Sequence, residues 1–219
     1  MSFKKQGFVR KSYEFEEEVS PTETDMKNFF EERTNKHIGL VKQYLRESCE
    51  HYPELADVLE KRGEEHDCSK LKPPEYEPYV HITWQYKVKG EGGEYDIDDD
   101  MAKRCHETSF NHCKGNRHHP EYWDKHLTGN PISFENRDAP SGIVVDATKM
   151  DRPSIIEMCC DWCSVSAERN PTNKFGPEEW AKENIHKRWK FTEKQEELIY
   201  EVINKIWVAK EEDPFLKDE

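Results

Sequence analysis

Apolar side chains recur every three or four positions along most of the chain, the spacing that places them on one face of an α-helix. In the segment 20–50, Ile38, Val41 and Leu45 form such a face. Ser20 begins a capping-box pattern, in which a serine and a glutamate three residues later satisfy the free N–H groups of a helix start. The pattern therefore predicts a long first helix over this segment.

Further helices follow from the same spacing and from capping residues. Thr192 and Gln195 form a second capping box, and Asp151 is a candidate cap for the helix that contains EMCCDWC. Gly63 is a candidate break, and the segment 75–87 is compatible with both helix and extended chain. The helices predicted after the first one cover residues 53–67, 99–113, 151–169, 176–189 and 192–207.

Strand patterns are scarce and no internal repeat is visible, so the chain is predicted to be all-α. Glycine, proline, asparagine and aspartate gather in residues 128–150, which predicts an irregular insertion. Residues 1–19 are interpreted as an N-terminal arm and 211–219 as a charged tail. The segment 20–210 is then one helical domain that contains the insertion.

The composition is typical of a folded domain with a heavily charged surface. The 219 residues suit one domain, with 34% hydrophobic and 36% charged residues. Six Trp, nine Tyr and ten Phe supply large side chains for a lean core. The formal net charge of −13 opposes binding to duplex nucleic acid through phosphate neutralisation.

The cysteines and the apolar runs indicate a compartment. No apolar run approaches the roughly 20 residues that a membrane span needs. Residues 1–20 lack the apolar stretch of a secretory signal. Seven cysteines without such a signal are typical of reduced thiols. We therefore expect a cytoplasmic protein without a membrane partner.

Four separated positions carry chemistry: His37, the pair His66-Asp67, the segment 112–123 (HCKGNRHHPEYW) and Asp161. Imidazoles and carboxylates are ligands for iron, manganese, zinc or magnesium, depending on how many of each converge. Each position alone has a structural interpretation, such as a hydrogen-bonded core histidine. Together they predict a metal site, because so many buried charges are costly to gather without a cation.

The order His…His-Asp…His…His…Asp on successive predicted helices resembles the HD-domain superfamily of metal-dependent phosphohydrolases. The resemblance covers about residues 34–207 and includes the motifs HDCSK, HCKGNRHHPEYW and EMCCDW. It implies an HD-domain-like helical bundle around one or two divalent ions, with iron, manganese, zinc, magnesium and cobalt as candidates. The implied ligands are His37, His66, Asp67, His112, one of His118 and His119, and Asp161.

The resemblance also implies roles for individual residues. Asp67 would bridge two ions and take part in catalysis through a metal-bound hydroxide. Lys70, three residues after Asp67, is expected to project from the same helix face as Asp67 and to bind a substrate phosphate. Its structural alternative is a surface ion pair with Glu75 or Glu77. Arg117 is a second, weaker candidate for phosphate binding.

Two expectations concern neighbours of the ligands. Glu157 lies one helical turn before Asp161 and is expected to orient a ligand histidine. Adjacent residues on a helix point about 100° apart, so only one of His118 and His119 is expected to be a ligand. Pro120 predicts a helix start with this pair on its leading turn.

An alternative ligand set uses cysteines. The sequence CDWC has zinc-ligand spacing, and Cys105 with Cys113 could complete a thiolate site. The simpler interpretation is that these cysteines pack as small apolar side chains. Aromatic residues that flank the motifs could stack on a base but more often belong to a core. They are Trp84, Tyr122, Trp123 and Trp162.

Three functions are therefore compared. The first is a metal-dependent phosphohydrolase, a phosphomonoesterase or phosphodiesterase acting on a nucleotide or another small phosphate ester. The second is a di-iron oxygenase on the same scaffold, because the same ligands serve both chemistries. The third is a binding protein without catalytic activity that keeps the metal for stability.

Overall fold

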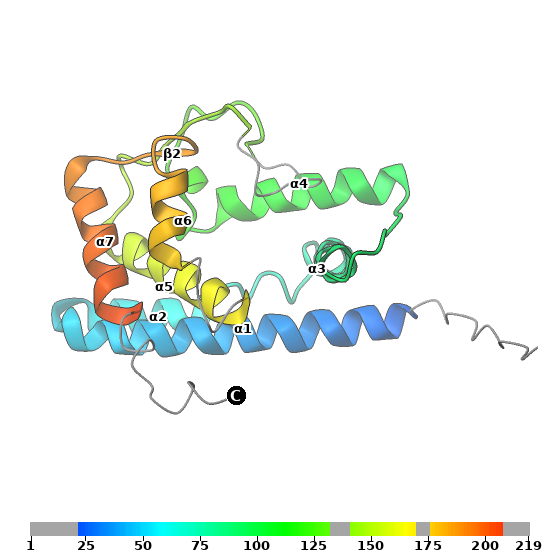
Figure 1. Ribbon diagram of the computed structural model, residues 1–219, viewed down its shortest axis with the longest axis horizontal. Helices are drawn as coiled ribbons and strands as arrows, with labels where there is room; N and C mark the ends of the chain where they lie inside the picture. The colour runs from blue at the N-terminus through cyan, green and yellow to red at the C-terminus, as the bar shows by residue number, and fades with distance from the viewer. Residues whose placement is uncertain (1–21, 132–140, 170–175, 208–219) are drawn as a thin grey trace, which may run out of the picture.

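The computed structural model describes residues 22–131, 141–169 and 176–207. These ranges are mostly helical, which confirms the predicted all-α fold (Figure 1). The helices are α1 Glu23–His51, α2 Ala56–Glu65, α3 Tyr76–Gly90, α4 Asp99–Gly115, α5 Arg152–Arg169, α6 Pro177–Asn184 and α7 Glu193–Trp207. Short 3-10 helices cover Pro53–Leu55 and Pro120–Tyr122, and the strands are β1 Val145–Asp146 and β2 Trp189–Lys190.

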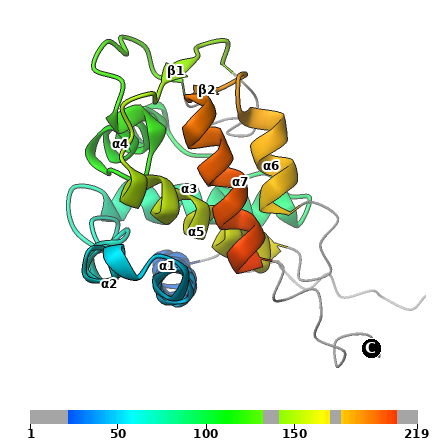
Figure 2. The same cartoon turned by 90° about the vertical axis from the view of Figure 1, so that its left-hand side faces the viewer.

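Helix α1 runs along one side of the molecule and is the base on which the others pack (Figures 1 and 2). It contacts α2, α3, α5 and α7. Its start is a capping box: Asp25 N–H donates to Thr22 Oγ1 (3.2 Å), and Thr22 N–H donates to the Asp25 carboxylate (2.9 Å). The predicted cap, Ser20, lies outside the described residues.

The apolar core is divided. The main core joins the second half of α1 to α2, α5 and α7, with Val41 and Leu45 among its buried residues. A smaller core joins the start of α1 to α3 through Phe30 and Trp84. A third cluster lies between α3 and α4. On α1, the stretch between Phe30 and Val41 therefore separates the two apolar cores and belongs to neither of them.

Predicted capping residues are confirmed in the second half of the chain. Ser154 N–H donates to Asp151 Oδ1 (2.9 Å) before the first turn of α5. Gln195 N–H donates to Thr192 Oγ1 (3.3 Å), and Thr192 N–H donates to the Gln195 side chain (2.8 Å) at the start of α7. The starts of both helices follow from local sequence because the capping side chains bond to backbone only three residues away.

Three boundaries differ from the prediction. Residues 53–67 divide into a 3-10 helix and α2, which ends at Glu65, and Gly63 lies inside α2 without breaking it. The predicted helix over 176–189 ends at Asn184, after which the chain turns into β2. There Trp189 pairs with Val145 of β1 in a short parallel ladder. The strands arise only from this long-range pairing, so no local pattern marks them.

The ambiguous segment 75–87 is helical from Tyr76 onward and belongs to α3. This helix packs against both α1 and α4, so it is buried on more than one side. A single apolar stripe is therefore missing, which explains the ambiguity. Its buried residues are Pro78, Val80, Ile82, Thr83, Trp84 and Gln85.

The described parts of the 128–150 segment are irregular up to β1, as expected. The proposed arm 1–19 and tail 211–219 lie outside the described residues. In the described ranges, no helix combines the length and apolar character that crossing a membrane would require.

Gly63 lies where α2 approaches α1 closely. A Cβ added there would meet Leu45 Cδ1 at 3.4 Å, whereas a Cβ on Gly39 of α1 would meet nothing within 4 Å. Gly63→Leu should lower the free energy of unfolding by about 1–3 kcal/mol, because the larger side chain must force the two helices apart. Gly39→Leu, the matched control, should raise it by up to about 1 kcal/mol through helix propensity. Urea unfolding followed by circular dichroism measures both, and equal effects would contradict this packing.

Candidate metal centre

Polar side chains from distant parts of the sequence meet between the apolar cores. On α1 the cluster begins at His37, between Phe30 of the smaller core and Val41 of the main core. The cluster consists of His37 on α1, His66 and Asp67 directly after α2, His112 on α4, His118 and His119 in the following loop, and Asp161 on α5. The structure thus brings together every residue that the HD-domain resemblance implies as a ligand.

Two groups of possible ligand atoms together contain all seven residues of the cluster, and a third group, His66, His118 and Glu157, overlaps both. In each group, one nitrogen or oxygen from every residue lies within 4.8 Å of the others. The first group is His37, His66 and Asp161, and the second group is Asp67, His112, His118 and His119.

The Asp67 carboxylate lies between the two groups. Its Oδ1 is 3.1 Å from His112 Nε2 and 3.6 Å from His118 Nε2, in the second group. Its Oδ2 is 3.8 Å from the Nε2 atoms of both His37 and His66, in the first group. Each oxygen thus faces a different group, which is the arrangement a bridging carboxylate needs.

Not all of the inward-facing atoms have a hydrogen-bond partner. Five of them are buried without one: His66 Nε2, Asp67 Oδ1, His112 Nε2, His118 Nε2 and His119 Nε2. Leaving a buried polar atom unsatisfied costs about 1–3 kcal/mol, so five at one place require an explanation. A cation satisfies them all, because an imidazole nitrogen and a carboxylate oxygen are metal ligands. These groups can hold a metal ion.

Carboxylates outside the cluster contact the Nδ1 atoms of four of its histidines. His66 Nδ1 donates to Glu157 Oε1 (3.0 Å), and His118 Nδ1 lies 3.4 Å from the same oxygen. His112 Nδ1 donates to Glu75 (2.8 Å) and His37 Nδ1 to Glu168 (2.9 Å). With the proton fixed on Nδ1, the lone pair of Nε2 points into the cluster, as metal ligation requires.

Glu157 was expected to contact a ligand histidine, and its contact with His66 agrees with this. The sequence did not predict the contacts of Glu75 and Glu168. Glu168 lies seven residues after Asp161 on α5, two turns along the same helix face, so the spacing could have identified it. Glu75 reaches His112 only because α3 and α4 pack together. Helical spacing carries no signal for that contact.

Charges in the cluster keep its carboxyl groups ionised. Burial would raise the pKa of Asp67, but Lys70, His66 and His112 hold that pKa well below 3.8. Burial would likewise raise the pKa of Asp161, but the hydrogen bond from His37 lowers it. Both aspartates are therefore anionic and able to bind a cation.

His119 and His37 differ in their electrostatic surroundings. Burial, followed by His118 and His112, lowers the pKa of His119 well below 6.5, which keeps its imidazole neutral. Burial would also lower the pKa of His37, but hydrogen bonds with Asp161 and Glu168 raise it to about 9. Without a cation His37 is thus protonated, and metal binding must release that proton.

The backbone at the His66-Asp67 pair is unusual. Helix α2 ends at Glu65, and Asp67 has a φ of 54°, in the left-handed region. Aspartate is among the few residues that enter this region without a large penalty. The turn that follows is closed by a bond from Lys70 N–H to the Asp67 carbonyl (3.0 Å). The pair is thus aimed by a strained turn, and strain of this kind often accompanies function.

Lys70 reaches Asp67 through that turn and not from a helix face, which corrects the expected geometry. Its Nζ donates to Asp67 Oδ2 (2.5 Å) and lies 5.1 Å from the centre of the Tyr79 ring. The surface ion pairs offered as an alternative are not formed, since Glu75 bonds to His112 and Glu77 to Arg104.

Arg117 is not brought to the two groups. Its guanidinium pairs with Asp151 (2.5 Å) and lies over the ring of Trp123, with the side chain about half exposed. The arginine follows α4 in a loop that turns its side chain toward the start of α5. Arg117 therefore lies away from the cluster, although it directly precedes His118 in the sequence.

His118 and His119 both reach the second group. A short 3-10 helix does start at Pro120, but the pair precedes it, and His119 has an extended backbone with φ −95° and ψ 133°. The 100° separation expected on a helix therefore does not apply. His119 also belongs to another group that could hold a metal, with Cys113 and Glu121.

The cysteine alternative is not supported. Cys159, Cys160 and Cys163 are buried in the main core, and Cys105 in the cluster between α3 and α4. Burial raises the pKa of Cys159 well above 9 and that of Cys105 to about 12, so these thiols stay protonated. Among the described residues, no candidate metal group contains two cysteines.

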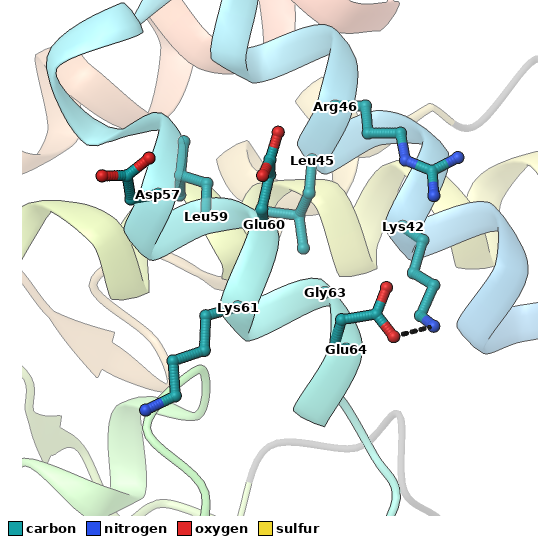
Figure 3. Close-up of a pocket in the computed structure, with 9 residues that line it drawn as sticks. All are labelled: Lys42, Leu45, Arg46, Asp57, Leu59, Glu60, Lys61, Gly63 and Glu64. Atoms are coloured by element: carbon teal, nitrogen blue, oxygen red, sulfur yellow. Dashed lines mark hydrogen bonds and ion pairs between the residues drawn. The ribbon is translucent and has the colours of Figure 1, made fainter.

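The flanking aromatic residues are mostly structural. Trp84 packs in the smaller core, and Trp162 stacks on Trp189 with ring centroids 5.4 Å apart. A surface hollow between α1 and α2 is also separate from the cluster (Figure 3). Lys42 and Glu64 pair across it, and none of the cluster residues lines it.

Substitution of either His66 or Asp67 should cause the protein to lose its bound metal. His66→Ala or Asp67→Asn should lose most bound metal, because each residue supplies an inward-facing atom that nothing else replaces. Asparagine also tolerates the left-handed backbone at position 67, so helical content should stay near that of the unchanged protein. Elemental analysis and circular dichroism measure the two quantities. Unchanged metal content in either variant would refute that residue as a ligand.

The two adjacent histidines should differ in strength. His118→Gln should lose more metal than His119→Gln, because Glu157 holds the His118 ring and increases its basicity as a ligand. We expect His119 to face substrate or the Cys113 side. Metal content after dialysis against a weak chelator measures the difference. Equal losses would show that both residues are ligands.

No curated protein and no solved structure matches the chain. A family model, by contrast, matches residues 26–205, a range that includes every residue of the two groups. The chain therefore belongs to the family of unknown function DUF5662.

Proposed function

We propose that this protein is a metal-dependent phosphohydrolase that acts on a nucleotide or another small phosphate ester. The position of Asp67 between the two ligand groups, with Lys70 beside it, carries the proposal. Two cations and a nearby ammonium are the groups that neutralise charge on a transferring phosphoryl group. This arrangement supports hydrolysis more directly than it supports a purely structural metal.

A substrate can approach the cluster from one edge. The side chains of Lys70, Asp161 and His37 are 20%, 18% and 12% exposed, whereas those of His66 and Asp67 are 0% and 2% exposed. The partly open edge thus combines one ligand group with the lysine. A structural metal site is typically closed on all sides, and a catalytic site keeps an open position.

Each residue then has a stated task. Divalent ions in the two groups would supply an activated water at neutral pH and would polarise the phosphoryl oxygens. The histidines and aspartates hold these ions, and the outer carboxylates keep the imidazoles in the required tautomer. Lys70 exchanges its bond to Asp67 for a bond to a phosphate oxygen. The donor set suits manganese, iron, zinc or cobalt more than magnesium, because it is rich in imidazole.

The protein's surroundings are part of the proposal. All seven cysteines are free thiols, which supports a reducing, cytoplasmic location. The net charge of −13 disfavours duplex nucleic acid as a substrate and leaves small phosphate esters.

The second candidate is an iron oxygenase, favoured by the same abundance of imidazole ligands. Purified protein should be loaded with Mn²⁺ without oxygen and screened for phosphate release over nucleotides, cyclic nucleotides and sugar phosphates. Phosphate release supports the proposal. Oxygen consumption by the Fe²⁺ form without phosphate release supports the oxygenase. Full metal content with neither activity indicates a binding protein.

Lys70 gives the sharpest test of the hydrolase. Lys70→Ala should keep its metal but lower kcat/KM by roughly ten- to a hundredfold, because a charge-assisted contact of about 1.5–3 kcal/mol is lost. Lys70→Arg should restore only part of the rate, since a planar guanidinium does not reproduce a compact ammonium. The exposed Lys72 provides the control, and Lys72→Ala should change neither quantity. Hydrolysis by Lys70→Ala at the unchanged rate would refute this role.

A further inference from the structure

Glu157 differs from the other outer carboxylates in the number of ligands that it supports. Its Oε1 lies 3.0 Å from His66 Nδ1 and 3.4 Å from His118 Nδ1, and its side chain is 5% exposed. Glu75 and Glu168, by contrast, each contact one ligand histidine, His112 and His37 respectively.

The two histidines that share Glu157 form one group with it, and each also belongs to a different one of the two groups described above. His66 lies with His37 and Asp161 in the first group, and His118 lies with Asp67, His112 and His119 in the second group. Their rings are close, with centroids 4.3 Å apart. One carboxylate on the outside of the cluster therefore touches one ligand of each group.

The other oxygen of Glu157 is fixed from outside the cluster. Arg62 Nη1 donates to Glu157 Oε2 (2.7 Å), and the same guanidinium lies 3.7 Å from Asp151. Arg62 is on α2, which His66 and Asp67 directly follow, and Glu157 is on α5, which carries Asp161, so this pair also joins two ligand-bearing segments. A carboxylate held at both oxygens cannot swing toward one histidine and away from the other.

From this geometry we propose that Glu157 is the common positioning residue of both metal groups, so that a single substitution there weakens divalent-cation binding at both. The inference rests on the two-metal centre of the proposed function but does not depend on the reaction. An outer partner of a metal ligand typically contributes ten- to a hundredfold in affinity. Glu157 should contribute that factor twice, and Glu75 and Glu168 once each.

The test measures Zn²⁺ affinity in two backgrounds that each keep one group intact. His112→Ala disables the second group and leaves the first, and His37→Ala disables the first and leaves the second. Competition with a chromogenic chelator gives the Zn²⁺ dissociation constant in each. Glu157→Gln is then added to both backgrounds, because glutamine keeps the shape but loses the charge and one acceptor oxygen.

We expect Glu157→Gln to weaken Zn²⁺ binding about ten- to a hundredfold in both backgrounds. Each matched control should weaken Zn²⁺ binding in only one of the two backgrounds. Glu168→Gln should weaken binding only where the first group remains, and Glu75→Gln only where the second remains. The visible absorption of bound Co²⁺ should change in the same pattern, and a general loss of stability would not produce that selectivity.

An effect of Glu157→Gln in only one background would overturn the inference, as would no effect in either. If that variant does not fold, Arg62→Gln decides, because it loosens Glu157 without touching a histidine. It should weaken Zn²⁺ binding in both backgrounds, and an effect in one alone would again overturn the inference. Absence of phosphate release, with this binding pattern intact, would refute the hydrolase and leave the role of Glu157 standing. If the unchanged protein binds fewer than two ions, the inference about Glu157 is overturned, and the phosphate-release screen alone decides the hydrolase.

Discussion

A buried carboxylate in a ring of imidazoles is the constraint on which the rest of this structure depends. Asp67 is 2% exposed and faces histidine nitrogens with both oxygens. Burying an ionised carboxylate without partners costs far more than the whole stability of a typical domain could offset. The fold therefore has to deliver partners to one point, and it draws them from α1, α4, α5 and the segments after α2 and α4.

This requirement explains why the apolar core is divided. The residues around Asp67 cannot be replaced by close-packed hydrocarbon, so the main core and the smaller α1–α3 core lie on either side of a polar centre. The outer carboxylates extend that centre by another layer. Glu75, Glu157 and Glu168 fix the imidazoles, and Arg62 in turn fixes Glu157. Each layer removes a degree of freedom from the one inside it, which is how a protein prepares a metal site in advance.

The charge arrangement is consistent with a role for cations at this centre. Two aspartates inside the cluster are held in their anionic form, and three more carboxylates surround it. Lys70 contacts Asp67 at the partly exposed edge of the cluster. A buried centre rich in anions and imidazoles, with an ammonium at its partly exposed edge, is suited to binding a cation first and an anionic substrate afterwards.

Features that depend only on neighbouring residues could be predicted from the sequence. Helical spacing and capping side chains gave the helices, as at Asp151 and Thr192, because these interactions span one turn. The ligand residue types also stood out, since adjacent histidines and aspartates have little use on an ordinary helix. The direction in which each side chain points depends instead on tertiary packing. The turn that carries Lys70 to Asp67, the extended backbone that lets both His118 and His119 reach one group, and the contact of Glu75 with His112 all depend on packing between distant segments. Local periodicity contains no information about such packing, because it describes the faces of one helix and not the partner that covers them.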